Sequence, residues 1–138
     1  MLAASGPVVS PSAETQYRPG VCNIGPEEIA RRRQAGHVGA AVSFGLLAGL
    51  VVAGAPRVVR LSVALPAAVA ASGYIQAQAR FCAGFGSRGV FNFGPLGEVS
   101  EVTDADALAR DRHRSRQIGM ASLAIGLATG ALAVAIPA

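Results

Sequence analysis

The chain has 138 residues, of which 51% are hydrophobic and only 14% carry a charge. A soluble domain of this length carries about a quarter charged residues, so the composition argues against a soluble globular protein. The net charge is +4, and all twelve basic residues are arginine. Because the arginines lie at the ends of apolar stretches, where membrane topology already requires them, a nucleic-acid partner is not indicated.

The N-terminal segment is rich in proline and serine and has little apolar content. No basic segment precedes an unbroken apolar run, so we expect no cleaved signal peptide. We predict that residues 1–20 form a disordered tail. The remainder, 21–138, is predicted to be a single membrane domain.

Three uncharged apolar stretches follow, at 37–55, 61–79 and 118–138. Each has about 20 residues, and a helix rising ~1.5 Å per residue needs ~20 residues to cross a hydrocarbon core of ~30 Å. The first stretch offers only Ser43 as a polar side chain after its initial histidine, so it lacks the wet face of a soluble helix. The sequence therefore predicts an all-α, three-span transmembrane helical bundle.

The arginines are distributed unevenly along the chain. Three spans place the N-terminal segment and the loop 80–117 on one side, with ten arginines, whereas the turn 56–60 holds only Arg57 and Arg60. The positive-inside rule therefore predicts a cytoplasmic N-terminus and loop, with the C-terminus outside. The Ala, Gly, Val and Arg bias is typical of a GC-rich bacterial genome. We therefore expect the bacterial cytoplasmic (inner) membrane.

Charged helices are expected to lead into the first and third spans. Pro26 is a favourable first helical residue, and two glutamates follow it in the first turn. Thr103, with Asp106 three residues on, resembles a capping box for the second helix. These helices are either solvated interfacial anchors or a site for lipid headgroups or a partner. The candidate headgroup ligands are Arg31, Arg32, Arg33, Arg112, Arg114 and Arg116.

Small residues recur every four positions in two of the spans. In lipid, close backbone approach through such residues drives helix association. We predict that the first and third spans pair through these ladders, which could equally face a partner subunit. The first ladder is Ala41, Gly45, Gly49 and Ala53, and the second is Ser122, Gly126 and Gly130.

A phenylalanine- and glycine-rich segment, 80–97, follows the second span. It is expected to rest on the cytoplasmic leaflet and fill the base of the bundle, or to form a docking surface for another membrane subunit, or to line a cofactor pocket. No lysine or flanking strand supports a phosphate-binding loop. The four phenylalanines that would make the contact are Phe81, Phe85, Phe91 and Phe93.

Two cysteines and two histidines are expected near the cytoplasmic surface. Cys22 and Cys82 could meet there, and with His37 and His113 they would suffice for a tetrahedral zinc site, although no CxxC or HxxxH spacing is present. Packing roles for the thiols, a redox or metal-linked pair, and lipidation all remain open. A stable disulfide is disfavoured in a reducing cytosol.

The stretch CNIGPEEIARRR, residues 22–33, together with RFCAGFGSRGVFNFG, residues 80–94, resembles small multi-pass membrane proteins of bacteria, including actinobacteria. In these proteins a short cytoplasmic lead precedes a few hydrophobic spans. The resemblance implies membrane location and assigns no residue a catalytic role.

The sequence contains no recognisable catalytic motif, so we predict neither an enzyme nor a cofactor. No Asp, Glu or Arg lies inside the three apolar stretches, which argues against a transporter or pump formed by this chain alone. The favoured function is a structural or accessory subunit whose partners are the lipid bilayer and other membrane proteins or a second copy. The alternatives are a thiol- or metal-handling protein using Cys22 and Cys82, and a lipid-binding protein using the arginines.

Overall fold

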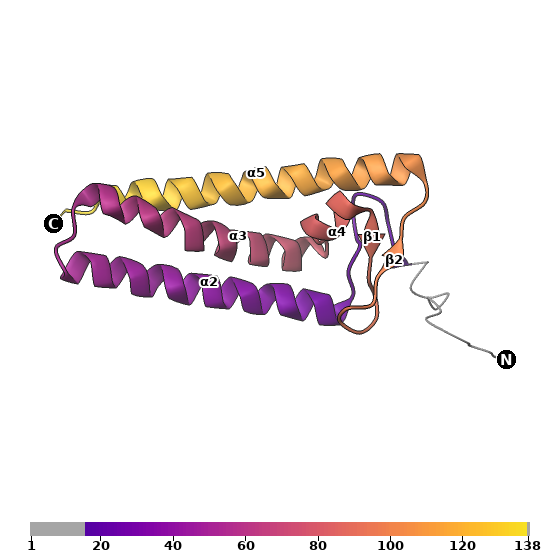
Figure 1. The fold of residues 1–138 in the computed structure, drawn as a ribbon, viewed down its shortest axis with the longest axis horizontal. Helices are drawn as coiled ribbons and strands as arrows, with labels where there is room; N and C mark the ends of the chain where they lie inside the picture. Colours follow the sequence, from indigo (N-terminus) through magenta and orange to yellow (C-terminus); the bar gives the residue numbers. More distant parts are fainter. Residues whose placement is uncertain (1–15, 138) are drawn as a thin grey trace. The chain divides into compact units, whose positions relative to one another are not determined.

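The computed structural model describes residues 16–137, so most of the predicted N-terminal tail lies outside the described residues. The described chain is mostly helical, as predicted, with one small sheet that was not predicted. In chain order the elements are α2 (Pro26–Val52), the 3-10 helix η1 (Arg57–Val63), α3 (Ala64–Ala79), α4 (Ala83–Arg88), strands β1 (Val90–Phe91) and β2 (Ser100–Glu101), and α5 (Ala105–Ala135) (Figure 1).

Three helical segments are long and apolar enough to cross a membrane, and each overlaps one of the three predicted spans. They run over Pro26–Val52, Arg57–Ala79 and Ala105–Ala135. Large apolar side chains on them are exposed, for example Phe44 at 75% and Val52 at 87%. Surfaces of this kind suit hydrocarbon rather than water. The structure therefore supports a multi-pass helical membrane protein.

The chain divides into two compact units. Among the described residues, we call 16–31 and 76–116 the polar unit, and 32–75 and 117–137 the apolar unit. Every Asp and Glu between residues 16 and 137 belongs to the polar unit. The apolar unit contains four arginines and no acidic residue.

Within the apolar unit, α2 and α3 meet through glycine. A Cβ atom added to Gly73 of α3 would lie 2.5 Å from the Gly36 nitrogen and 2.6 Å from the Arg32 carbonyl oxygen of α2. A Cβ added to Gly39 would lie 2.7 Å from the Ala70 nitrogen. The two backbones are therefore in direct contact, which only small residues allow.

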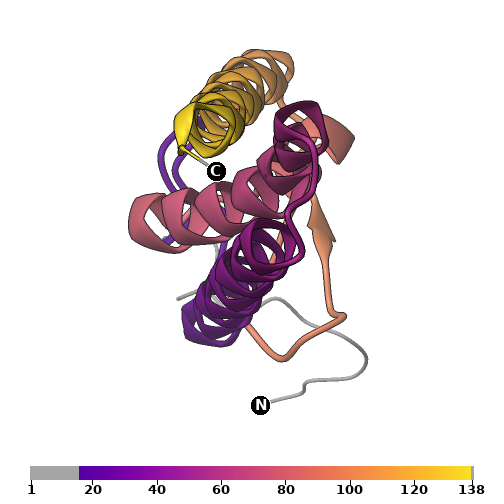
Figure 2. The same ribbon diagram turned by 90° about the vertical axis from the view of Figure 1, so that its left-hand side faces the viewer.

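The ladder on the third span packs against α3 rather than α2. A Cβ at Gly126 would come within 2.7 Å of the Ala64 carbonyl oxygen, and one at Gly130 within 2.9 Å of the Ala64 Cβ. Figure 2 shows α3 with α2 on one side and α5 on the other. The predicted pairing of the two ladders is therefore wrong, because each outer helix uses small residues to approach α3.

The helix ends follow the local sequence closely. The helix α2 begins at Pro26, as predicted, and ends where Gly54 adopts a positive φ of 68°. There the Gly54 and Ala55 nitrogens donate to the carbonyls of Val51 and Leu50, which is a Schellman motif. The predicted cap of the last helix was one residue early: Asp104, not Thr103, accepts from the Ala107 nitrogen at 2.9 Å. A carboxylate is an equally good cap and also favours the helix dipole.

In the polar unit, short extended segments connect residues 22–33 with residues 80–94. Ile24 forms a parallel bridge with Asn92, and β1 pairs antiparallel with β2 through Val90–Glu101 and Phe91–Ser100. A Cβ at Gly25 would lie 2.8 Å from the Phe93 carbonyl oxygen, so this segment needs glycine. A core of Ile24, Cys82 and Phe85 forms beside them. Residues 22–33 and 80–94 thus pack on one another within the polar unit up to Arg31.

The helix contact predicts unequal effects for two glycines. Gly73→Ala inserts a methyl group against backbone atoms and should lower the free energy of unfolding by about 1–3 kcal/mol. Gly45→Ala places the same group where no atom lies within 4 Å, so it should leave stability unchanged or raise it by up to about 1 kcal/mol. Thermal unfolding in detergent measures both. Equal effects of the two substitutions would contradict the contact.

Candidate functional site

A buried asparagine joins the N-terminal segment to the end of α3. The Asn23 side-chain nitrogen donates to the Cys82 carbonyl oxygen at 3.1 Å, and its side-chain oxygen accepts from the Cys82 nitrogen at 2.6 Å. The Asn23 backbone nitrogen donates to the carbonyl oxygen of Arg80 at 3.1 Å. Arg80 holds a positive φ of 56°, uncommon for a residue other than glycine. Asn23 thus forms hydrogen bonds with the backbone of Arg80 and Cys82, much as a neighbouring strand would. These bonds satisfy backbone groups in the turn that follows α3.

The second asparagine organises the turn after β1. The Asn92 side-chain nitrogen donates to Glu28 at 3.0 Å and to the Pro95 carbonyl at 2.8 Å, while its oxygen accepts from the Gly94 nitrogen at 2.9 Å. Glu28 is fully buried on the first turn of α2. Asn92 therefore uses its amide to tie the turn to α2, and it supplies part of the hydrogen bonding that the buried carboxylate needs.

A third buried group, Asp111 of α5, holds the first described residues. Its two oxygens accept from the Tyr17 hydroxyl at 2.5 Å and from the Gly20 nitrogen at 2.7 Å. Burial of the Tyr17 phenol, and then the hydrogen bond and charge of Asp111, raise the pKa of Tyr17 above its usual value. The neutral hydroxyl is therefore kept as the donor to the carboxylate.

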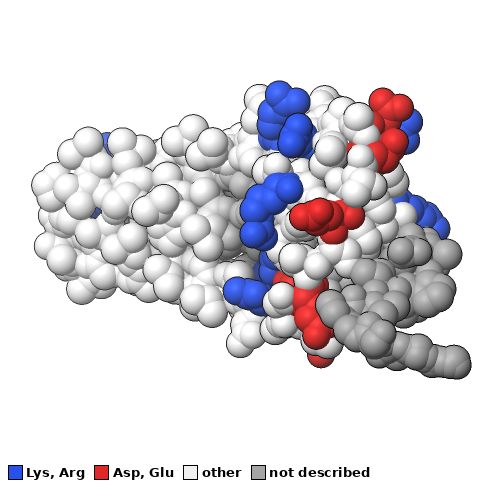
Figure 3. Space-filling model, turned by 45° about the vertical axis from the view of Figure 1, so that its right-hand side comes forward, with Lys and Arg blue, Asp and Glu red and all other residues white. Residues whose placement is uncertain are grey.

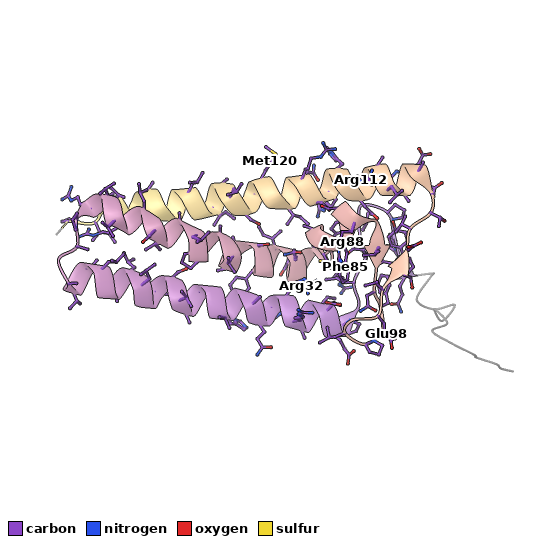
Figure 4. The ribbon with its side chains drawn as sticks, in the orientation of Figure 1. Arg32, Phe85, Arg88, Glu98, Arg112 and Met120 are labelled. Carbon is purple, nitrogen blue, oxygen red and sulfur yellow. The ribbon has the colours of Figure 1, made fainter. Side chains whose placement is uncertain are left out.

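The phenylalanine-rich segment folds inward. Phe81, Phe85 and Phe91 are buried, and Phe93 is half-buried. The Tyr17 ring stacks on Phe91 with centroids 4.7 Å apart. The prediction that these side chains form a docking surface is thus corrected for the three buried ones, because they fill the interior of the polar unit. Figure 4 shows Phe85 and Arg88 on α4, where the guanidinium lies 5.4 Å from the ring centroid.

The cysteines have local roles and are not joined. Cys82 is buried and caps α4, where its sulfur accepts from the Phe85 nitrogen at 3.5 Å. Cys22 is half-buried, and its thiol lies 3.9 Å from the Ile24 carbonyl oxygen. His37 of the apolar unit lies 2.7 Å from the Tyr74 hydroxyl, and His113 is exposed on α5.

The predicted four-ligand zinc site is not formed in the described part of the chain. Between residues 16 and 137, no three His, Cys, Asp or Glu side chains are grouped so that they could hold a metal ion. The prediction of a metal site at Cys22 and Cys82 is therefore corrected. The Cys82 thiol caps α4, and no third ligand joins the two cysteines among the described residues.

The candidate headgroup ligands differ in exposure. Figure 3 shows arginine and acidic side chains interspersed on part of the surface and a broad area without charge. Arg112 projects outward from α5 in Figure 4. Arg114 is half-buried, and its Nε atom has no hydrogen-bond partner. Exposed guanidinium groups remain able to bind phosphate bidentately. The exposed members of the predicted set are Arg31, Arg33, Arg112 and Arg116.

One face of α2 has no partner within the apolar unit. The four residues of its ladder are all exposed, and nothing lies within 4 Å of a Cβ added at Gly45 or Gly49. In the most apolar part of α2 only 11% of the residues are buried, against 33% for the second span and 28% for the third. This open face is the clearest candidate site for an interaction. The other predicted contact residues, Gly126 and Gly130, by contrast, already pack against Ala64 of α3.

The buried polar side chains of the polar unit were not predicted from the sequence. Asn23 and Asn92 are the only asparagines in the chain. Each stands between apolar side chains, in Cys-Asn-Ile and Phe-Asn-Phe, and an amide in such surroundings is the signal that could have indicated burial with defined partners. Asp111 lies in a run of charged residues, where nothing in the sequence distinguishes it from its exposed neighbours.

No protein-family model, curated protein or solved structure matches the chain.

Removing the Asn23 amide tests whether it fixes the polar unit. Asn23→Ala removes the side-chain acceptor of the buried Cys82 nitrogen and one of the two donors to the Cys82 carbonyl oxygen, which still accepts from the Gly86 nitrogen at 2.9 Å. The substitution should therefore lower the free energy of unfolding by about 1–3 kcal/mol. Ser87→Ala, an exposed change in α4, serves as the control and should cost less than about 0.5 kcal/mol. Thermal unfolding measures the difference. Equal stability of the two variants would show that the Asn23 amide contributes nothing.

Tyr17 should resist ionisation at alkaline pH. In a Tyr74→Phe variant it is the only tyrosine, so ultraviolet absorbance reports its phenolate directly. Because the folded pKa is raised above the unfolded value of ~10, the stability contribution is complete below pH ~10 and is lost as pH rises through the raised pKa. Adding Asp111→Asn should lower the pKa of Tyr17. A Tyr17 phenol that titrates near ~10 in the folded protein would rule out this interaction.

Proposed function

We propose that the chain is a structural or accessory subunit of a larger membrane assembly, located in the bacterial cytoplasmic membrane. The open glycine face of α2 carries this proposal. Five of the eight glycines in α2, α3 and α5 meet another helix or the side chain of a neighbouring one, whereas Gly45, Gly49 and Gly119 meet nothing within 4 Å.

Glycine within a helix needs a compensating contact. Each glycine costs a helix up to about 1 kcal/mol relative to alanine, so a pair spaced four residues apart on an open face is unfavourable for the isolated chain. In lipid, such a pair lets a second helix approach closely enough for extensive van der Waals contact. Ala41 and Ala53 extend this surface by one turn in each direction. We infer that another membrane helix covers it, from another subunit or from a second copy.

The arginine distribution supports the orientation. Ten of the twelve arginines lie in the N-terminal segment and in residues 80–117. The positive-inside rule then places the polar unit in the cytoplasm and the C-terminus outside. In this orientation the exposed arginines of the predicted headgroup set lie where anionic lipids are abundant. They would anchor the subunit rather than select a partner.

The rival function as a thiol- or metal-handling protein has no comparable support. Its two cysteines lie in the same unit, but Cys82 is buried as a helix cap, and no third ligand accompanies it in residues 16–137. The accessory function is therefore the better account of the described residues.

Bulky substitutions on the open face should break the assembly. The tagged protein is extracted from its own host in mild detergent and weighed by native mass spectrometry. The wild type should carry additional chains, and Gly45→Leu combined with Gly49→Leu should weaken the association constant about tenfold, which corresponds to ~1.4 kcal/mol. Gly119→Leu, at an equally open position on α5, is the matched control and should assemble normally.

Two results would contradict the proposal. The first is a wild-type protein that appears only as a single chain under conditions in which it remains folded. The second is an equal loss of assembly in the Gly119→Leu control, because it would show a general intolerance of bulk on the helix surface rather than an interface on α2.

A further inference from the structure

A completely buried arginine lies at the start of the second span. Arg60 is in the 3-10 helix η1, has 0% of its surface exposed, and is the largest fully buried side chain among residues 16–137. From the sequence, Arg60 was expected in a short turn between spans. In the structure the helical segment already begins at Arg57, so Arg60 belongs to the span.

Only one nitrogen of the Arg60 guanidinium has a partner. Nη1 donates to the carbonyl oxygen of Ile136 at 2.6 Å, just past the end of α5. The cation thus caps a helix C-terminus, where the dipole is negative. The Nε and Nη2 atoms are buried and have no hydrogen-bond partner. These two nitrogens form one edge of the planar group, and their N–H bonds point in parallel, as bidentate recognition of an oxyanion requires.

No acidic side chain of the apolar unit neutralises this charge, because the unit contains no Asp or Glu. A helix dipole supplies only about half an elementary charge. A buried charge is costly unless it is both paired and hydrogen-bonded, so two unpartnered donors on a buried cation indicate a site for an anion.

We propose that the Nε–Nη2 edge of Arg60 binds a phosphate group, supplied by a phospholipid headgroup or by inorganic phosphate. Two oxygens of one phosphate match the spacing of the two donors, and the dianion or monoanion balances the guanidinium. The surroundings fit the boundary between headgroups and hydrocarbon. On the same 3-10 helix, Val58 and Leu61 are exposed apolar side chains, and Arg57 is an exposed cation.

Binding requires a local rearrangement, because neither nitrogen is accessible in the structure. Arginine has four rotatable side-chain bonds, and Arg60 makes a single hydrogen bond, so we expect the guanidinium to turn toward the phosphate while the helix stays in place. A phosphate that occupies the edge should stabilise the folded protein, because it binds the folded state and not the unfolded one.

Native mass spectrometry of the purified full chain in detergent tests the site with two probes, phosphatidylglycerol and inorganic phosphate. The affinity of the most tightly bound molecule is measured for each. Arg60→Gln should weaken it about tenfold or more, because both donors are lost. Arg60→Lys should recover only part of the affinity, since an ammonium group keeps the charge but lacks the planar fork.

Arg57→Gln is the matched control. It removes an equal charge from an exposed position that lies one 3-10 turn before Arg60. It should change the affinity by less than about twofold, as expected for a solvated surface charge. If Arg60→Gln does not fold, Arg60→Lys and Arg57→Gln still separate a specific fork from general electrostatic attraction.

The outcomes are distinct. Tight, Arg60-dependent binding of phosphatidylglycerol alone assigns the site to a lipid headgroup, whereas competition by inorganic phosphate assigns it to the free anion. Equal losses in the Arg57 and Arg60 variants would overturn the proposal. So would a folded wild-type protein that binds neither probe.

Discussion

Direct contact between helix backbones is the constraint on which the apolar unit depends. Lipid offers no hydrophobic driving force for helix association, so stability comes from the number of atoms that two helices bring together. At Gly73 the backbones of α2 and α3 approach so closely that a single methyl group would overlap main-chain atoms. The same close approach brings Gly126 of α5 onto Ala64. Because α3 takes both contacts, the outer face of α2 is left without one.

The polar unit is held together by a different interaction. Its strands have two residues each, too few to satisfy the backbone of the loops around them. Side-chain amides and carboxylates satisfy that backbone instead. Asn23 forms hydrogen bonds with the Cys82 backbone, and Asp111 accepts hydrogen bonds from the Tyr17 hydroxyl and the Gly20 nitrogen. Buried polar groups of this kind fix one arrangement, because any other leaves donors or acceptors unpaired. The phenylalanine rings that the sequence suggested as a docking surface for a partner are instead buried in the same unit as this network.

The sequence predicts those features that depend on neighbouring residues. Hydropathy locates the three spans, and the Gly-Pro-Glu-Glu start of α2 gives its first residue, because capping and dipole effects act within one turn. Helix pairing is different, since glycine and alanine are so frequent that several faces offer a ladder. The contact of Gly126 with Ala64 depends on residues about 60 positions apart, and the burial of Arg60 on a carbonyl 76 positions later. No local pattern encodes such distances.

The two open features of the apolar unit lead to one conclusion. Arg60 is a buried cation with two unpaired donors, in a unit that has no acid, and α2 presents glycines that no helix covers. A chain evolved to be stable alone would replace either feature at little cost, by a neutral side chain or by alanine, since most proteins retain simple routes to higher stability. Retaining both is understandable if the missing contacts are made by components of the membrane. In the proposed assembly, the anion would supply the pairing that Arg60 lacks, and a neighbouring helix would supply the contact that α2 lacks.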